Sequence, residues 1–140
     1  MSVAVDILAA VKSALEGVSG LSAEKVIRGL PQDGATGPCA WVAAGDLQTG
    51  FVDLATYEQV ILVDWWATPA VDSDTFGARE DACLALSSLC VDAIRASTTL
   101  QALCLTPVEV ATRLRVGNDG HSQPLIVGVV SCKYESEGGL

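Results

Sequence analysis

The fold is best predicted from one stretch of the chain, TYEQVILVDWWAT (Thr56–Thr68). We interpret it as a β-strand, in which successive side chains point to opposite faces of a sheet. Trp65 then lies on the same face as Ile61, whereas Trp66 lies on the opposite face. Because helices that cover one side of a sheet can bury only one of the two indoles, we expect Trp65 in the core and Trp66 outside it.

The face that carries Trp66 is a candidate subunit interface. It also carries Glu58 and Asp64, which are costly to bury without a partner. One interpretation therefore leaves Trp66 half exposed and covered in part by a loop. The other is a contact between subunits, because tryptophan is enriched at the centres of interfaces. Two apolar neighbours on the same face, Val60 and Leu62, belong to this candidate interface.

Two further strands are predicted near the carboxyl end of the chain. Val108–Val116 alternates between apolar and polar residues, and Leu125–Tyr134 is apolar on both faces in its middle. The residues Gly117–Gly120 between them (GNDG) favour a turn, so the two strands should form a hairpin.

This terminal hairpin supplies the remaining interface candidates. Its surplus of apolar surface suggests burial against neighbouring copies of the chain. We select Ile126 and Val130 on the last strand, and Arg113 and Arg115 on the strand before it. The two arginines are either partners for acidic groups of a neighbouring copy or ordinary solvated residues.

Two amphipathic helices are predicted. The first spans Val3–Gly17, with Ser2 as its N-cap and Gly17 ending it in a left-handed conformation. The second spans about Thr75–Ala96, and the run Asp72–Asp74 provides N-cap chemistry for it. Its charged residues, Arg79 among them, are expected to face outward.

The rest of the chain completes an α+β fold. Lys25–Leu30 and Cys39–Ala44 are predicted as short strands, and the acidic segment Gly45–Leu54 as an exposed connection or a loose hairpin. We expect a mostly antiparallel sheet of about four or five strands, with two main helices packed on one face. The chain should form a single domain, 1–140, in which 135–140 is a flexible tail.

The composition excludes several classes of protein. The chain has 140 residues, of which 50% are hydrophobic, so one domain with a substantial core is expected. Its formal net charge of −9 gives no gain from counterion release, which argues against tight binding to DNA or RNA. No apolar run approaches the roughly 20 residues of a membrane span, and no basic stretch precedes the amino-terminal helix. We therefore expect a soluble protein with no membrane partner.

No catalytic, cofactor or metal site is predicted. The five cysteines contain no CxxC pair and there is a single histidine, His121, so reduced buried thiols are favoured over a zinc site. Asp72 and Asp74 fit helix capping better than a calcium loop, whose fifth position would be Phe76. Phosphate-loop and nucleophile-elbow motifs are both lacking. We expect no enzymatic activity.

The order of the elements is similar to that of a known family. The helix Val3–Gly17 is followed by a Gly- and Pro-rich loop, a strand opened by Pro38–Val42 (PCAWV), and an acidic connection. The long strand then ends at Pro69, a second helix leads to Ser97–Leu100, and the terminal hairpin ends with Lys133–Glu135. This order resembles the tail terminator proteins of long-tailed bacteriophages, of the lambdoid type, over nearly the full length. The resemblance is architectural, and no functional residue of the family is assigned to this chain.

The resemblance implies a structural virion protein that assembles as a homo-oligomeric ring, typically a hexamer. Such a ring caps the tail tube, stops its polymerisation and joins the tail to the head connector or stopper protein. Its place is the head–tail junction of the virion, after assembly in the cytoplasm of the host bacterium. Phage DNA passes through the central hole without specific binding. A ring built from head-to-tail contacts needs two different contact surfaces on each subunit.

Two other classes remain open. One is another neck or head-completion (stopper) protein, which would bind the connector side and ignore the end of the tail tube. The other is a small cytoplasmic enzyme or ligand-binding domain. That class would require a turnover that depends on His121 or on one of the cysteines.

Overall fold

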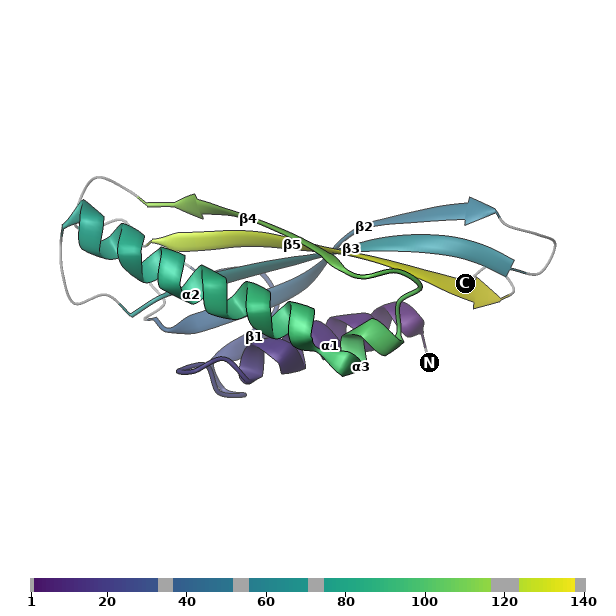
Figure 1. The fold of residues 1–140 in the computed structure, drawn as a ribbon, viewed down its shortest axis with the longest axis horizontal. Helices are drawn as coiled ribbons and strands as arrows, with labels where there is room; N and C mark the ends of the chain where they lie inside the picture. Colours follow the sequence, from purple (N-terminus) through teal and green to yellow (C-terminus); the bar gives the residue numbers. More distant parts are fainter. Residues whose placement is uncertain (1, 33–36, 52–55, 71–74, 117–123, 138–140) are drawn as a thin grey trace.

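The computed structural model describes residues 2–32, 37–51, 56–70, 75–116 and 124–137 of the chain. Within these residues the chain forms a single five-stranded sheet with three helices on one side of it (Figure 1). The elements in chain order are α1 (Val3–Glu16), β1 (Val26–Arg28), β2 (Cys39–Phe51), β3 (Thr56–Thr68), α2 (Phe76–Ala96), α3 (Thr98–Ala102), β4 (Glu109–Arg115) and β5 (Leu125–Glu137).

The sheet is mixed, with the strand order β1-β2-β3-β5-β4. The pairs β2–β3, β3–β5 and β4–β5 are antiparallel, whereas β1 is parallel to β2. Backbone N–H groups of Ala40 and Gly29 donate to the carbonyls of Lys25 (2.8 Å) and Val42 (2.9 Å), and these bonds hold β1 in place. The predicted α+β class is confirmed, and the expected mostly antiparallel sheet is corrected to a mixed one.

The long strands extend further than expected. β3 has the predicted bounds, but β2 continues past Ala44 to Phe51 and forms a long hairpin with it. A β-bulge between Ala44 and Leu47 interrupts their register. β5 continues to Glu137, three residues into the segment expected to be a tail, and residues 138–140 lie outside the described part. The β2–β3 hairpin and the end of β5 therefore reach beyond the helices, at the right of Figure 1.

The first helix forms as its apolar spacing predicts. Ile7, Val11 and Leu15 lie four residues apart on one face of α1, and all three are fully buried. Ser2 occupies the N-cap position without a side-chain cap hydrogen bond. Gly17 ends the helix with φ −81°, so the expected left-handed conformation is wrong.

The second helix begins with a cap that differs from the expected one. The hydroxyl of Thr75 accepts a hydrogen bond from the backbone N–H of Ala78 (3.3 Å), whereas Asp72–Asp74 lie outside the described residues. The expectation that Arg79 faces outward is wrong, because it is only 3% exposed. It lies four residues before Cys83, at the start of the stripe that α2 buries against the sheet.

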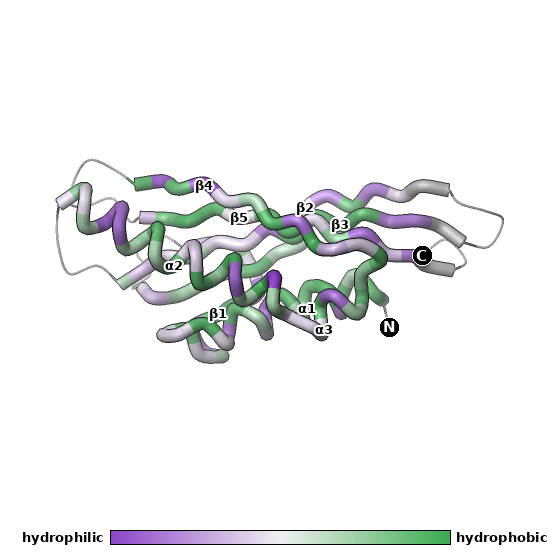
Figure 2. Tube along the Cα trace, viewed as in Figure 1, coloured by the Kyte–Doolittle hydropathy of each residue, from purple (hydrophilic) through white to green (hydrophobic). Residues whose placement is uncertain are grey.

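The core lies between the helices and one face of the sheet. Figure 2 shows hydrophobic residues concentrated in α1 and in the middle of the strands. Trp65 is fully buried in this core, as predicted, and Gly128 of β5 is its cross-strand partner. A Cβ atom at position 128 would lie 2.0 Å from Cε2 of Trp65. Gly128 therefore provides the space that the indole occupies.

Candidate assembly surface

The side of the sheet that faces away from the helices, here called the helix-free face, is the candidate assembly surface. Trp41 of β2 lies directly opposite Trp66 of β3, and Trp66 lies opposite Val127 of β5. Ile27 of β1 and Arg113 of β4 extend this row to the two edges of the sheet. The register thus brings five residues from five strands into one line, which we call the tryptophan row: Ile27, Trp41, Trp66, Val127 and Arg113.

The tryptophan row is apolar over four of its five positions and only partly covered. Trp41 is 2% exposed, and its indole N–H finds no hydrogen-bond acceptor among the described residues. Ile27 at the edge is 44% exposed. Trp66 and Val127 are half-buried, although none of the described helices packs over them. The row therefore leaves a strip of apolar surface accessible in a single copy of the chain.

Five of the seven predicted interface residues lie on this face. Val60, Leu62 and Trp66 of β3 are half-buried there, beside one another on alternate positions of the strand. Arg113 and Arg115 are exposed on β4, opposite Val127 and Leu125 of β5. The structure brings these residues to one side of the sheet.

The prediction that Ile126 and Val130 lie on an outer interface is wrong. Both side chains are fully buried in the core. Val130 lies opposite Val63, which belongs to the same core, so this face of β5 is the one that the helices cover. The outward-facing apolar residues of the strand are its alternate positions Leu125, Val127 and Val129, all half-buried.

Sequence reasoning also missed Trp41 and Ile27. The middle of β5 is apolar on both faces, so its orientation cannot be read there. The last residues of the strand indicate its orientation. Lys133 lies on the same face as Val127, and its charge marks that face as the outer one, whereas Tyr134 lies on the same face as Ile126. Trp41 belongs to the strand that the sequence predicts only as Cys39–Ala44, and its pairing with Trp66 is set by the longer hairpin. Ile27 belongs to a strand whose pairing no local pattern specifies.

Charges on the helix-free face are unevenly distributed. Lys133 forms an ion pair with Glu58 (2.9 Å) toward the end of the sheet that extends past the helices. Asp64 lies near the bulge, where burial and then the charge of Asp46 raise the pKa of its carboxyl above the ordinary value. Arg113 and Arg115, at the opposite end, form no ion pair with any described residue.

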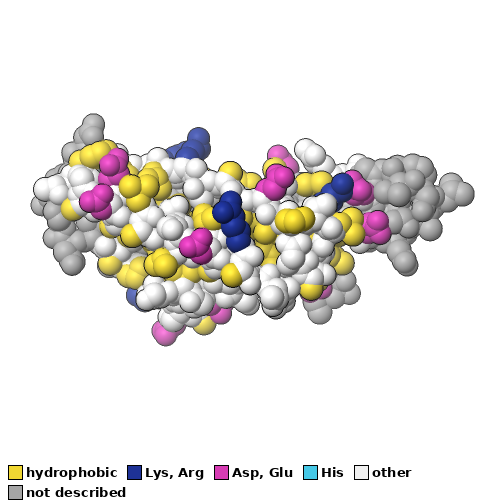
Figure 3. All heavy atoms as spheres, in the orientation of Figure 1, with side chains coloured by type: hydrophobic (Ala, Val, Ile, Leu, Met, Phe, Trp, Pro, Cys, Tyr) yellow, Lys and Arg dark blue, Asp and Glu magenta, His cyan; other side chains and the backbone are white. Residues whose placement is uncertain are grey.

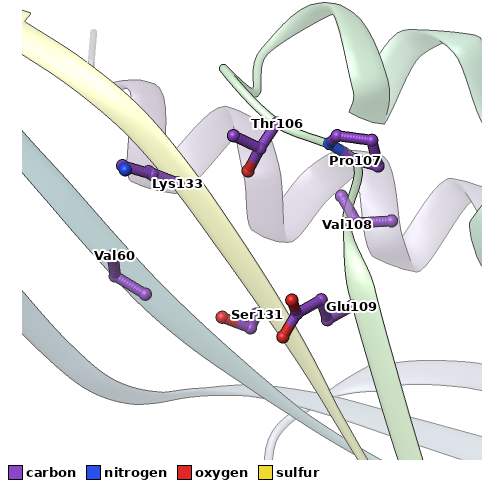
Figure 4. A pocket seen from close by; sticks show the side chains of 7 residues that line it. All are labelled: Val60, Thr106, Pro107, Val108, Glu109, Ser131 and Lys133. Atoms are coloured by element: carbon purple, nitrogen blue, oxygen red, sulfur yellow. The ribbon is translucent and has the colours of Figure 1, made fainter.

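A hollow opens on the same face where β4 begins (Figure 4). Its volume is about 510 Å³, and Glu109 and Ser131, which are register partners on β4 and β5, line it side by side. The side chain of Gln101 fixes one wall, because its Nε2 donates to the carbonyl of Thr106 (2.9 Å) and its Oε1 accepts from the N–H of Val108 (3.2 Å). The lining contains one acid and one base, and the base is already paired, so the hollow offers little free charge for a small ligand. The lining residues are Val60, Thr106, Pro107, Val108, Glu109, Ser131 and Lys133.

The described residues provide little reactive chemistry. All five cysteines are free, as predicted. Burial raises the pKa of Cys83 to about 11 and of Cys90 and Cys132 to about 12, so these thiols stay neutral and are poor nucleophiles. Among the residues described, no three histidines, cysteines or acids come together as a metal site, and no helix has the length and apolarity to cross a membrane. His121 lies outside the described part of the chain.

Comparison of the sequence with protein-family models and with curated proteins identifies no relative. No protein-family model matches this chain, and no curated protein matches it closely enough in sequence to be taken as one. The helix-free face is therefore interpreted from its own residues, register and charges.

Proposed function

We propose that this chain is a phage tail terminator. In this role it is a structural protein that forms a ring on the tail tube, stops tube polymerisation and joins the tail to the head connector. The proposal extends the resemblance in element order described above, and it assigns the chain to the virion rather than to catalysis.

The observation that carries the proposal is the tryptophan row. In a solitary two-layer protein the uncovered side of the sheet is normally polar. Here that side presents Trp66 and Val127 half-buried, between Trp41 and an arginine. Tryptophan and arginine are residue types enriched at the centres of protein interfaces. Repeated association with further copies is a use of this surface that needs no ligand.

The shape of the subunit also supports the proposal. The β2–β3 hairpin and the end of β5 extend past the helices on one side of the molecule (Figure 1). An element that projects from a ring is available to contact the tube below it or the connector above it. The net charge of −9 suits a ring that lets DNA pass without holding it.

Tail-tube polymerisation tests the proposal. The purified chain is added in excess to polymerising tail-tube protein of the same phage, and tube lengths are measured by electron microscopy. We expect tubes that stop growing and carry a ring at one end. Tubes that continue to lengthen as they do without the chain would refute a terminator role. Binding to the connector without an effect on tubes would instead favour a stopper protein.

A matched pair of variants links this activity to the proposed surface. Trp66→Glu places a charge in the tryptophan row, whereas Val5→Glu places the same charge on α1, where Val5 is 47% exposed on the helix side. We expect Trp66→Glu, but not Val5→Glu, to lose the ability to stop tube growth. Equal activity of the two variants would show that the row is not required.

A further inference from the structure

The helix-free face needs a different surface as its counterpart on the next copy. A ring requires a contact in which two unlike surfaces meet, because like surfaces meeting about a two-fold axis close into dimers. The opposite side of the subunit is formed largely by α2, and Figure 3 shows acidic and hydrophobic side chains next to one another over the amino-terminal part of this helix, at the left of the view.

The outer face of α2 carries more apolar surface than a solvated helix requires. Leu84 is 53% exposed and Leu89 is 47% exposed, on the side away from the buried stripe. Ala85, between them, is exposed as well. A single exposed leucine needs no explanation, but here two lie on the two flanks of the exposed side of one helix, about 140° apart around its axis, with Ala85 between them.

Each of the two surfaces carries a pair of like charges, and the two pairs are opposite in sign. Arg113 and Arg115, here called the arginine pair, border the tryptophan row on the helix-free face. Glu80 and Asp81, here called the acidic pair, precede Leu84 on the outer face of α2. Neither pair forms an ion pair with the described residues of its own chain. Opposite charges at the rim of an apolar contact orient two subunits and exclude other arrangements.

The spacing of charge and apolar residues also matches. On the helix-free face, Val127 lies one strand from Arg113 and Trp66 lies two strands away, or about 5 and 10 Å at the spacing of neighbouring strands. On α2, Leu84 and Leu89 follow Asp81 by about 4.5 and 12 Å at 1.5 Å per residue. A helix laid across the strands can therefore bring Asp81 to the arginine, while Leu84 and Leu89, on either flank of Asp81, reach down to the apolar row.

We propose that the helix-free face of one copy binds the outer face of α2 of the next copy. The arginine pair contacts the acidic pair, and the leucines of α2 pack against Trp66 and Val127. The inference rests on the proposed ring and specifies the contact from which the ring is built. Both surfaces belong to every copy, so the contact repeats around the ring until the last subunit meets the first.

Charge reversal tests the contact. The first variant carries Arg113→Glu with Arg115→Glu, and the second carries Glu80→Lys with Asp81→Lys. Each places like charges on the two opposed surfaces, so we expect each alone to weaken self-association at least about tenfold, as measured by light scattering and sedimentation. A chain with all four substitutions has complementary surfaces again, and we expect it to recover association. An equimolar mixture of the two variants should recover it too, since each surface then meets one of opposite charge.

A control and the contrary outcomes complete the test. Lys25→Glu with Arg28→Glu changes the net charge as much as the first variant does, at two exposed cations near β1, and should leave association unchanged. The inference is overturned if the four-substitution chain remains as weak as either parent variant, or if the second variant associates normally. A native chain that stays monomeric at high concentration overturns it as well. The tube-growth experiment decides the terminator role separately, because a monomer that still stops tubes would overturn only the proposed contact.

Discussion

The two faces of the sheet differ most clearly at two neighbouring residues, Trp65 and Trp66. Trp65 is fully buried, and its indole occupies the space left by Gly128. Trp66 is half-buried and lies opposite Trp41 and Val127. The same side chain thus serves folding on one face, and in the proposed ring it serves association on the other. On this proposal, the face that a residue occupies, rather than its hydrophobicity, decides which of these roles it has.

The largest expected effect comes from a charge placed on the core face. Trp65→Glu should destabilise the fold by more than about 4 kcal/mol or prevent folding, because it buries an unpaired carboxylate and removes a large side chain. Trp66→Glu should cost about 1 kcal/mol and leave a folded monomer. Urea unfolding followed by circular dichroism measures both values, and light scattering measures assembly. Similar losses of stability in the two variants would contradict the assignment of the faces.

The next effect concerns the space beside Trp65. Gly128→Ala should destabilise the fold by about 2–3 kcal/mol, because its Cβ would overlap the indole and force the core to shift. Gly77→Ala in α2 is the matched control, since nothing lies within 4 Å of a Cβ there. The control should be unchanged or more stable by less than about 1 kcal/mol, because alanine favours a helix over glycine. A tolerated Gly128→Ala would mean that Trp65 is packed elsewhere.

A pair of valines on β5 gives a smaller contrast. Val130→Ala removes two fully buried methyl groups and should cost about 2 kcal/mol. Val127→Ala, on the half-buried face, should cost less than about 1 kcal/mol but weaken self-association. Thermal or chemical unfolding of both variants measures this difference. If Val127→Ala were the more damaging to the fold, the orientation of β5 would be reversed.

The smallest effect is expected at Asp64 and depends on pH. Burial, and then the nearby Asp46, raise the pKa of Asp64 above its ordinary value of 3.8. The folded state therefore favours the protonated carboxyl, and this contribution is complete below pH 3.8 and is lost as the pH rises through the raised pKa. Asp64→Asn stays neutral, so it should be more stable than the native chain at pH 7, with a difference that shrinks toward pH 4. A difference that is constant with pH would exclude this cause.

Local patterns were sufficient to predict much of the fold. The alternation in Thr56–Thr68 gave the bounds of β3 and the burial of Trp65, and the four-residue spacing of α1 gave its buried stripe. The turn signal after Val116 predicted the antiparallel pairing of β4 with β5. These features depend on neighbours in the sequence, which is why the sequence alone reveals them.

The errors concern features that depend on distant residues. Ile126 and Val130 were placed on the wrong face because Gly128 interrupts the buried side of β5, and the reason for that glycine is Trp65, more than 60 positions earlier. The parallel pairing of β1 has no local signal in three residues. Two of the five residues of the tryptophan row were likewise hidden, because Trp41 and Ile27 join Trp66 only through the register of the folded sheet.

The bulge in β2 has a consequence for the outer edge of that strand. β1 pairs with only Ala40–Val42, so the described part of β2 beyond Val42 has an edge without a neighbouring strand. Such an edge can recruit strands of other molecules in open-ended stacks. The irregularity between Ala44 and Leu47 breaks the ladder of free backbone groups, and Asp46 adds a charge at that point. The chain is therefore protected against fibrous aggregation along this edge.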